Sequence, residues 1–135
     1  MPAVKRLLVA FALLASLAGA CSTSPVGVWE LDKPAMKAAA TELPAADVDR
    51  MLSGIGESTI ELKPDGTAAL RAKVLFDGRT IDDATTGTWN LEGDELSVVA
   101  KGRGGHDVVE VFDYGGSSLT GRLSTLKLPM IYRRR

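Results

Sequence analysis

The stretch Thr67-Ala68-Ala69-Leu70-Arg71-Ala72-Lys73-Val74-Leu75-Phe76-Asp77-Gly78, residues 67–78, decides the fold. Its apolar side chains recur at every second position, which is typical of a β-strand that buries one face. The apolar face holds Ala68, Leu70, Ala72, Val74 and Phe76, with Arg71 and Lys73 on the opposite face. Asp77-Gly78 favours a tight hairpin turn, so we expect the chain to return as an antiparallel strand.

The same alternation continues in both directions from this strand, interrupted by short turn sequences such as Pro64-Asp65-Gly66. The predicted strands are 27–31, 58–63, 67–76, 79–84, 87–91, 96–100, 106–114, 118–123 and 130–134. About eight or nine strands at hairpin spacing predict a mainly β chain, arranged as an antiparallel meander. Because closure removes exposed edges, a sheet of this many strands tends to close. We therefore predict a small barrel, with an open curved sheet covered by helices as the alternative.

Residues 33–56 change character and predict a helical insertion after the first strand. Asp32 can cap a helix, and a second short helix is predicted from Ala45 to Ser53 after the interruption at Pro44. The apolar positions at helical spacing include Met36, Ala39, Ala40, Leu43, Val48, Met51 and Leu52. Two interpretations stay open. The helical pair either packs on the sheet to complete the core, or forms a lid over an apolar cavity, where flexible methionines suit a variable ligand.

The pattern Gly-x-Trp-x-Leu occurs twice, at residues 27–31 and 87–91. A glycine lets the backbone bend at the start of a strand, and a tryptophan can then close the end of a core. We expect both tryptophans to face inward. The predicted core or ligand-pocket residues are Trp29, Met36, Met51, Leu52, Leu70 and Trp89.

Residues 1–20 have the order of a secretory signal peptide: Lys5 and Arg6, an apolar run, then small residues up to Ala20. The apolar run is shorter than the roughly 20 residues needed to span a bilayer. Small residues leading directly into Cys21 resemble the lipobox of bacterial lipoproteins. This resemblance implies cleavage before Cys21 and lipidation of its thiol. An ordinary secreted protein cut after Ala20, with Cys21 a free thiol, is the alternative.

The expected organisation is then a signal peptide at 1–20, a lipidated tether at 21–26 and one barrel domain at 27–135. Ser22 follows the cysteine, where an aspartate would resemble the inner-membrane retention signal. We therefore expect an envelope protein attached through Cys21 to the outer membrane and facing the periplasm. The chain has 16 basic and 17 acidic residues, and removal of Lys5 and Arg6 makes it more acidic. This charge argues against a nucleic-acid partner.

The sequence offers little that points to catalysis, and we expect neither an enzyme nor a cofactor or metal site. His106 is the only histidine, whereas a zinc site needs three or four ligands. Asp82 and Asp83 are neighbours on a predicted strand and so point to opposite faces. Glu110 shares a strand face with apolar residues and would need a partner such as Arg122. The three arginines at positions 133–135 are expected to be solvated, with contact to anionic headgroups as the alternative.

An early Gly-x-Trp strand, a helical insertion, an Asp-Gly hairpin, a Gly-Thr-Trp strand and a C-terminal Tyr-Arg together resemble small bacterial lipocalin-like lipoproteins. This resemblance implies a calycin-type barrel and names no ligand. We expect a non-enzymatic envelope lipoprotein that binds an apolar small molecule or lipid inside the barrel. The alternative is a protein-interaction module, an inhibitor or assembly partner of an envelope protein, acting through loops 77–86 and 101–106.

Overall fold

The computed structural model describes residues 24–102, 104–122 and 128–135. Cys21 lies outside these residues, as do Arg103 and Lys127. In chain order the elements are β1 (Gly27–Leu31), α2 (Lys33–Ala39), α3 (Ala45–Gly54), β2 (Ile55–Leu62), β3 (Thr67–Phe76), β4 (Arg79–Glu92), β5 (Glu95–Lys101), β6 (Asp107–Tyr114), β7 (Ser118–Gly121) and β8 (Ile131–Arg134).

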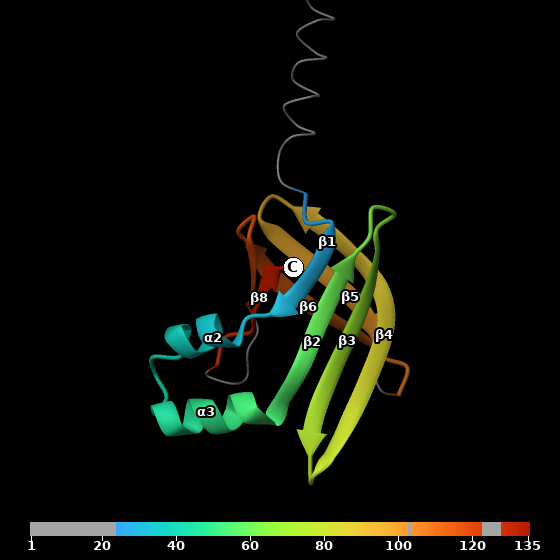
Figure 1. Cartoon of the computed structure of the whole chain (residues 1–135). Helices are drawn as coiled ribbons and strands as arrows, with labels where there is room; N and C mark the ends of the chain where they lie inside the picture. The colour runs from blue at the N-terminus through green and yellow to red at the C-terminus, as the bar shows by residue number, and fades with distance from the viewer. Residues whose placement is uncertain (1–23, 103, 123–127) are drawn as a thin grey trace, which may run out of the picture.

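The strands form a closed antiparallel barrel in sequence order (Figure 1). Each strand pairs with its neighbour along the chain, and β8 pairs with β1 to close the ring, with Glu30 opposite Arg133 in the register. The predicted barrel is confirmed, and the open sheet is excluded. The turns at Gly66, Gly93 and Gly116 all have positive φ, a conformation that glycine adopts without a steric penalty.

The barrel has eight strands because two predicted strands are one. We expected separate strands at 79–84 and 87–91, but Thr85 and Thr86 continue the ladder, opposite Leu70 and Ala69 of β3. The hairpin ladder therefore runs uninterrupted over the whole length of β3. The strand predicted at 118–123 ends at Gly121, and the strand predicted from Met130 begins at Ile131.

The helical insertion is confirmed, with different ends. Asp32 caps α2, since its carboxylate accepts a hydrogen bond from the Ala35 N–H at 3.1 Å. The helix ends at Ala39, and α3 ends at Gly54, so that Ile55 and Gly56 belong to β2 rather than to the predicted insertion. Gly56 is required for close packing: a Cβ there would lie 2.6 Å from the Lys73 carbonyl oxygen.

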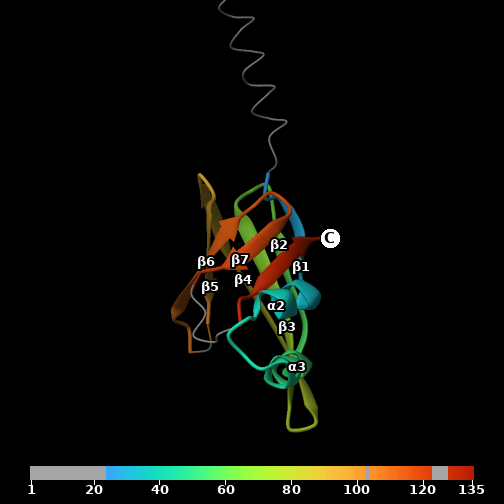
Figure 2. The same ribbon diagram turned by 90° about the vertical axis from the view of Figure 1, so that its left-hand side faces the viewer.

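The end of the barrel where the described chain begins and ends is filled with side chains. Its core consists of Trp29, Ile60, Leu62, Ala68, Leu96, Val98, Phe112, Leu119 and Tyr132. A second cluster lies between the helices and the barrel and consists of Met36, Ala40, Val48, Leu52 and Leu128. Figure 2 shows α2 near the middle of the barrel, beside β8, and α3 below it, beside β3. Each cluster buries one apolar face of its elements, which stabilises the fold.

At the opposite end the barrel wall separates between β4 and β5. These strands pair from Glu92–Glu95 to Gly87–Ala100 and no further. Gly87 is the last residue of β4 that pairs with β5. It must be small because a Cβ there would lie 2.0 Å from the Val99 carbonyl oxygen. Beyond it, residues 79–86 of β4 pair with β3 alone. In this half of the barrel the β3–β4 hairpin, which is still paired with β2, diverges from the β5–β6 hairpin (Figure 1).

Candidate functional site

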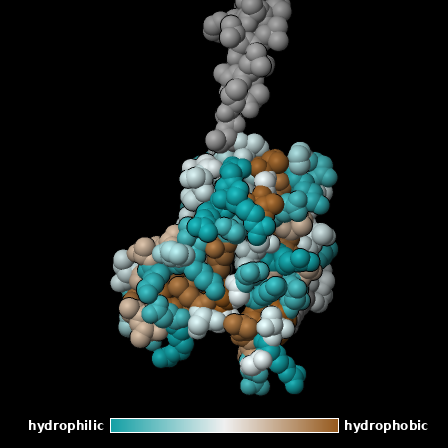
Figure 3. All heavy atoms as spheres, in the orientation of Figure 1, coloured by the Kyte–Doolittle hydropathy of each residue, from teal (hydrophilic) through white to brown (hydrophobic). Residues whose placement is uncertain are grey.

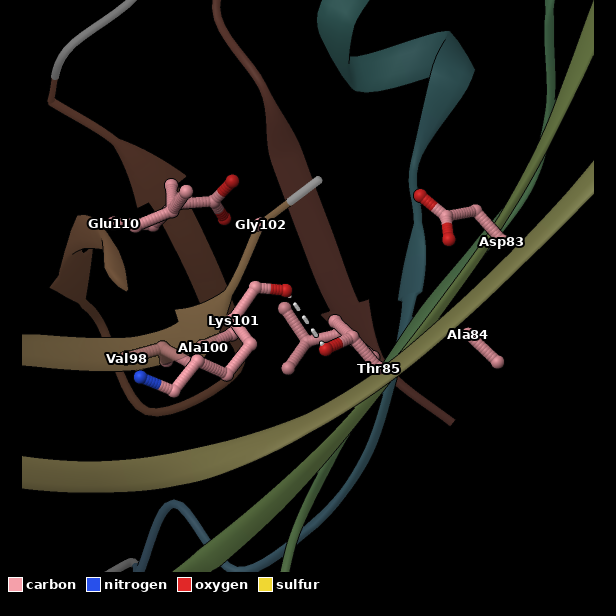
Figure 4. A pocket seen from close by; sticks show the side chains of 10 residues that line it. Asp83, Ala84, Thr85, Val98, Ala100, Lys101, Gly102 and Glu110 are labelled. Carbon is pink, nitrogen blue, oxygen red and sulfur yellow. Dashed lines mark hydrogen bonds between the residues drawn. The ribbon is translucent and has the colours of Figure 1, made fainter. Parts of the chain in front are cut away.

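A cavity of about 410 Å³ lies between the two diverging hairpins (Figure 4). One wall comes from β3–β4 and the other from β5–β6 and the residue that follows β5. The lining residues are Leu70, Asp83, Ala84, Thr85, Val98, Ala100, Lys101, Gly102, Val108 and Glu110. Such a volume falls within the range of small-molecule sites, which are usually concave and mostly apolar with a few polar groups.

The strand registers explain why these residues share the cavity. Leu70 lies opposite Thr85, and Val98 lies opposite Glu110, so each pair shares one face of its hairpin. Val98 is buried beneath the cavity, as part of the filled core. Val108 is 45% exposed on the wall. The cavity therefore begins where the packed core ends.

Apolar side chains also gather outside the cavity at this end. Figure 3 shows brown, apolar side chains toward the lower part of the molecule, around the helices. Among the residues that the structure describes, the large apolar side chains that are exposed are Val74, Leu75, Phe76, Ile81, Val108 and Val109. Four of them belong to the part of the β3–β4 hairpin that extends past the filled core, and Phe76 at its tip is 69% exposed.

Glu110 places a carboxylate among the apolar residues of the wall. It lies on the inward face of β6, two residues from the buried Phe112 and opposite Val98. The side chain still reaches solvent through the open end, but its surroundings disfavour the charged form. Burial accordingly raises the pKa of Glu110.

The predicted Glu110–Arg122 pair is wrong. Arg122 instead binds Asp113, at 2.6 Å, and Glu95, at 3.1 Å, and the Asp113 hydrogen bond raises the pKa of the guanidinium. The reason is the register of β7: Gly121 lies opposite Phe112 on the inward face, so the next residue points outward.

Asp83 brings a second carboxylate into the cavity, from the opposite wall. It lies opposite Ala72 on the inward face of β4, whereas Asp82 lies opposite Lys73 on the outer face. The prediction that the two aspartates point to opposite faces is thereby confirmed. Figure 4 shows the carboxylates of Asp83 and Glu110 turned toward the space between the hairpins.

Three hydroxyl groups add polarity on this side of the core. Thr85 donates a hydrogen bond to the Lys101 carbonyl at 3.0 Å, across the line where the strands separate (Figure 4). Deeper inside, the Tyr132 hydroxyl is 3.0 Å from the Ser58 hydroxyl. Burial raises the pKa of Tyr132, the Ser58 hydrogen bond opposes that rise, and the negative charge of Glu110 adds to it. The phenol is therefore neutral and available as a hydrogen-bond partner.

The six predicted core or pocket residues separate into three places. Trp29 lies in the filled core, and Trp89 is half-buried against it. Met36 and Leu52 are buried in the helical cluster, with Met51 packed against it. Leu70 alone among the six lines the cavity. The helices lend no side chain to that cavity, so the packing corresponds to the first interpretation of the helical pair, in which it completes the core.

The group that closes the filled end was not predicted from the sequence. Trp29 is 0% exposed, and its indole N–H donates to the Pro25 carbonyl at 2.8 Å. The Arg134 guanidinium lies over the Trp29 ring, 4.5 Å from its centroid, and donates to the carbonyls of Val26, at 2.8 Å, and Ser24, at 2.7 Å. The expectation that residues 133–135 are simply solvated is therefore wrong for Arg134. Its neighbours Arg133 and Arg135 both pair with Glu30.

Other candidate chemistry is not supported by the arrangement. His106 is exposed in the turn before β6. Among residues 24–102, 104–122 and 128–135, no group of three or more potential ligands could hold a metal ion. In the same part of the chain, no helix has the length and apolar character needed to cross a bilayer.

Replacing Glu110 with glutamine is expected to stabilise the protein at neutral pH and to have little effect near about pH 4. In the wild type the folded state holds the proton of Glu110 more tightly than the unfolded state does. Wild-type stability therefore falls as pH rises from the ordinary glutamate pKa through the raised value, and glutamine removes this loss. Thermal unfolding of both proteins across this range checks the effect. A difference in melting temperature that does not change with pH would contradict it.

Comparisons with known proteins found similarity to solved structures alone. Neither a protein-family model nor a curated protein matches the chain. A solved structure described as REP1-NXSQ fatty acid transporter matches with 17% identity and a TM-score of 0.40, over 82% of this chain and 95% of that one. A fatty acid-binding protein from Drosophila melanogaster brain tissue matches with 18% identity and a TM-score of 0.38, over 82% of this chain and 99% of that one. At these values the similarity carries no argument about function.

Proposed function

We propose that the protein is a non-enzymatic, lipid-anchored protein of the cell envelope that binds one apolar small molecule in the open half of its barrel. The observation that carries the binding proposal is the half-filled interior. Trp29 and its neighbours pack one end completely, whereas the diverging hairpins leave about 410 Å³ at the other. Burying an apolar molecule against Leu70, Val98 and Val108 would contribute about 25 cal/mol for each Å² of apolar surface removed from water.

The position of the tether supports the anchoring proposal. Ser24 and Val26 are held by Arg134 at the filled end, and Cys21 precedes Ser24 by three residues. An acylated Cys21 would place the filled end next to the membrane, so that the cavity opens away from it. Two or more acyl chains suffice for stable attachment. The absence of aspartate after Cys21 favours the outer membrane, with the barrel in the periplasm.

Replacing Val108 with tryptophan is expected to weaken binding of a neutral apolar fluorophore, N-phenyl-1-naphthylamine, by tenfold or more, because the larger side chain occupies the cavity. The matched control is Val109→Trp. Val109 is the next residue on β6 and is 55% exposed, on the outer face. Titration of both variants and the wild type by fluorescence measures the effect. Equal affinity in Val108→Trp and wild type would show that the cavity is not the site.

Replacing Cys21 with alanine is expected to release the protein from the membrane fraction, because no acyl chain can then be attached. The measurement is fractionation of cells after a high-salt wash, with Ser22→Ala as the control. Retention of the Cys21→Ala variant in the membrane fraction would contradict lipid anchoring. Neither substitution touches the barrel, so the two variants are expected to unfold at the same temperature.

A second candidate function, docking to an envelope protein, is favoured by the exposed apolar tip of the β3–β4 hairpin. Leu75 is 50% exposed and Phe76 is 69% exposed, next to the Asp77-Gly78 turn. Apolar side chains of this size at the surface often mark interaction sites. The Phe76→Ser substitution distinguishes the two candidate functions, because it would impair docking and leave fluorophore binding in the cavity unchanged.

A further inference from the structure

The polar groups of the cavity restrict the chemical class of its ligand. The walls carry two carboxylates, Asp83 on β4 and Glu110 on β6, and they come from the two hairpins that face one another. Figure 4 shows both directed into the same space. A ligand between the hairpins therefore meets hydrogen-bond acceptors on both sides, in a cavity lined by both apolar and polar side chains. Such polar groups fix the orientation of what binds.

Within the described residues, no cation balances these carboxylates. Lys101 is the only basic residue of that part of the chain that lines the cavity, and its ammonium is 2.7 Å from Asp107. Arg122 is bound to Asp113 and Glu95 on the outside of the barrel. Arg134 lies at the other end, over Trp29.

The two acids also have no partner in each other. Burial disfavours the charged form of Glu110 and so raises the pKa of its side chain. An ammonium group between the hairpins would be attracted to the carboxylates of both walls, whereas a carboxylate ligand would add a third negative charge.

We propose that the cavity selects an apolar molecule with a cationic amine head over one with a carboxylate head. The apolar body would lie against Leu70, Val98 and Val108, and the ammonium would lie between the walls that carry Asp83 and Glu110. This inference rests on the proposed function, because it needs the cavity to be the binding site. Hydrogen bonds between charged groups are stronger than neutral ones, so the preference should be large.

The test compares dodecylamine, dodecanol and dodecanoate, which share one chain and differ in the head. Displacement of N-phenyl-1-naphthylamine from the full-length protein at neutral pH gives their affinities, with each ligand kept below its aggregation limit. We expect dodecylamine to bind about tenfold or more tightly than dodecanoate, with dodecanol between them. Asp83→Asn and Glu110→Gln should each weaken dodecylamine by several-fold or more and leave dodecanol unchanged.

The matched control is Asp82→Asn, which makes the same charge change at the neighbouring residue on the outer face of β4, opposite Lys73. It should leave all three affinities unchanged. Far-UV circular dichroism of each variant shows whether it is folded, and Glu110→Gln is expected to be at least as stable as the wild type.

Dodecanoate binding as tightly as dodecylamine would overturn the inference, as would an Asp82→Asn variant that loses as much affinity as Asp83→Asn. In either case the proposed function would still stand if dodecanol binds the wild type and fails to bind the Val108→Trp variant. If dodecanol and the fluorophore both fail to bind, the proposed function fails, and the inference fails with it.

Discussion

Replacing Trp29 with alanine is expected to lower the free energy of unfolding by about 3–5 kcal/mol. The ring is fully buried and packs edge-to-face on Tyr114, with centroids 6.1 Å apart. Its removal would leave a void in the filled half, and the Arg134 guanidinium would lose the ring over which it lies. It would also remove the indole that hydrogen-bonds the Pro25 carbonyl. The loss of the buried ring and the loss of these contacts both lower the free energy of unfolding.

Denaturant unfolding measures this effect, provided that the slope of free energy against denaturant concentration is unchanged. Trp89→Ala is the control within the same motif. Trp89 also has a hydrogen-bonded indole, to the Lys63 carbonyl at 2.8 Å, but it is only half-buried, so a smaller loss is expected. A loss below about 1 kcal/mol for Trp29→Ala would contradict the assignment of this end as the packed core.

Replacing Arg134 with alanine is expected to cost roughly 2–3 kcal/mol. One guanidinium holds the carbonyls of Ser24, Val26 and Gly116 and covers the Trp29 ring, so its removal leaves several groups without their donor. Arg134→Lys should recover only part of the loss, because an ammonium lacks the planar arrangement of donors.

Arg133→Ala is the matched control, because Arg133 makes a surface ion pair with Glu30, and such pairs contribute at most about 1 kcal/mol. The Arg134→Ala variant should also be cleaved sooner than wild type by a protease that acts near residues 24–26, since those residues lose their fixation. If Arg133→Ala and Arg134→Ala lose equal stability, then Arg134 does not close the filled end.

The alternation of residues along the strands was sufficient to predict the barrel. Leu70 and its even-numbered neighbours on β3 face inward as the period of two requires, and the Asp77-Gly78 turn returns the chain as expected. The helical insertion was predictable from Asp32, Pro44 and the spacing of apolar residues. These signals are local, and each depends on the residues of one element.

The features that could not be predicted from the sequence depend on where the pairing between neighbouring strands ends. No sequence feature near Gly87 indicates that β4 and β5 stop pairing there, so the divergence of the hairpins was not predicted. The sequence also did not show that β4 is continuous, and two strands were predicted in place of one. The pairing of Arg122 was predicted wrongly for the same reason, because its face follows from the register of β7 on β6.

The cavity and the Arg134 contact share this origin. Asp83 and Glu110 lie on separate hairpins, and only the closed ring brings them to one cavity. The three terminal arginines look alike in sequence, but the pairing of β8 with β1 places Trp29 opposite Arg134 and leaves Arg133 opposite Glu30. Contacts between distant parts of the chain therefore carry the candidate site, and local patterns could not reveal them.

Mass spectrometry of the full-length protein purified from its native source, under native and then denaturing conditions, tests the central claim most directly. A barrel that binds one apolar molecule in its open half should carry a noncovalent small molecule at one copy per chain, released on denaturation and absent from the Val108→Trp variant. A native mass equal to that of the chain with its covalent modifications alone, unchanged after incubation with envelope lipids, would contradict the claim.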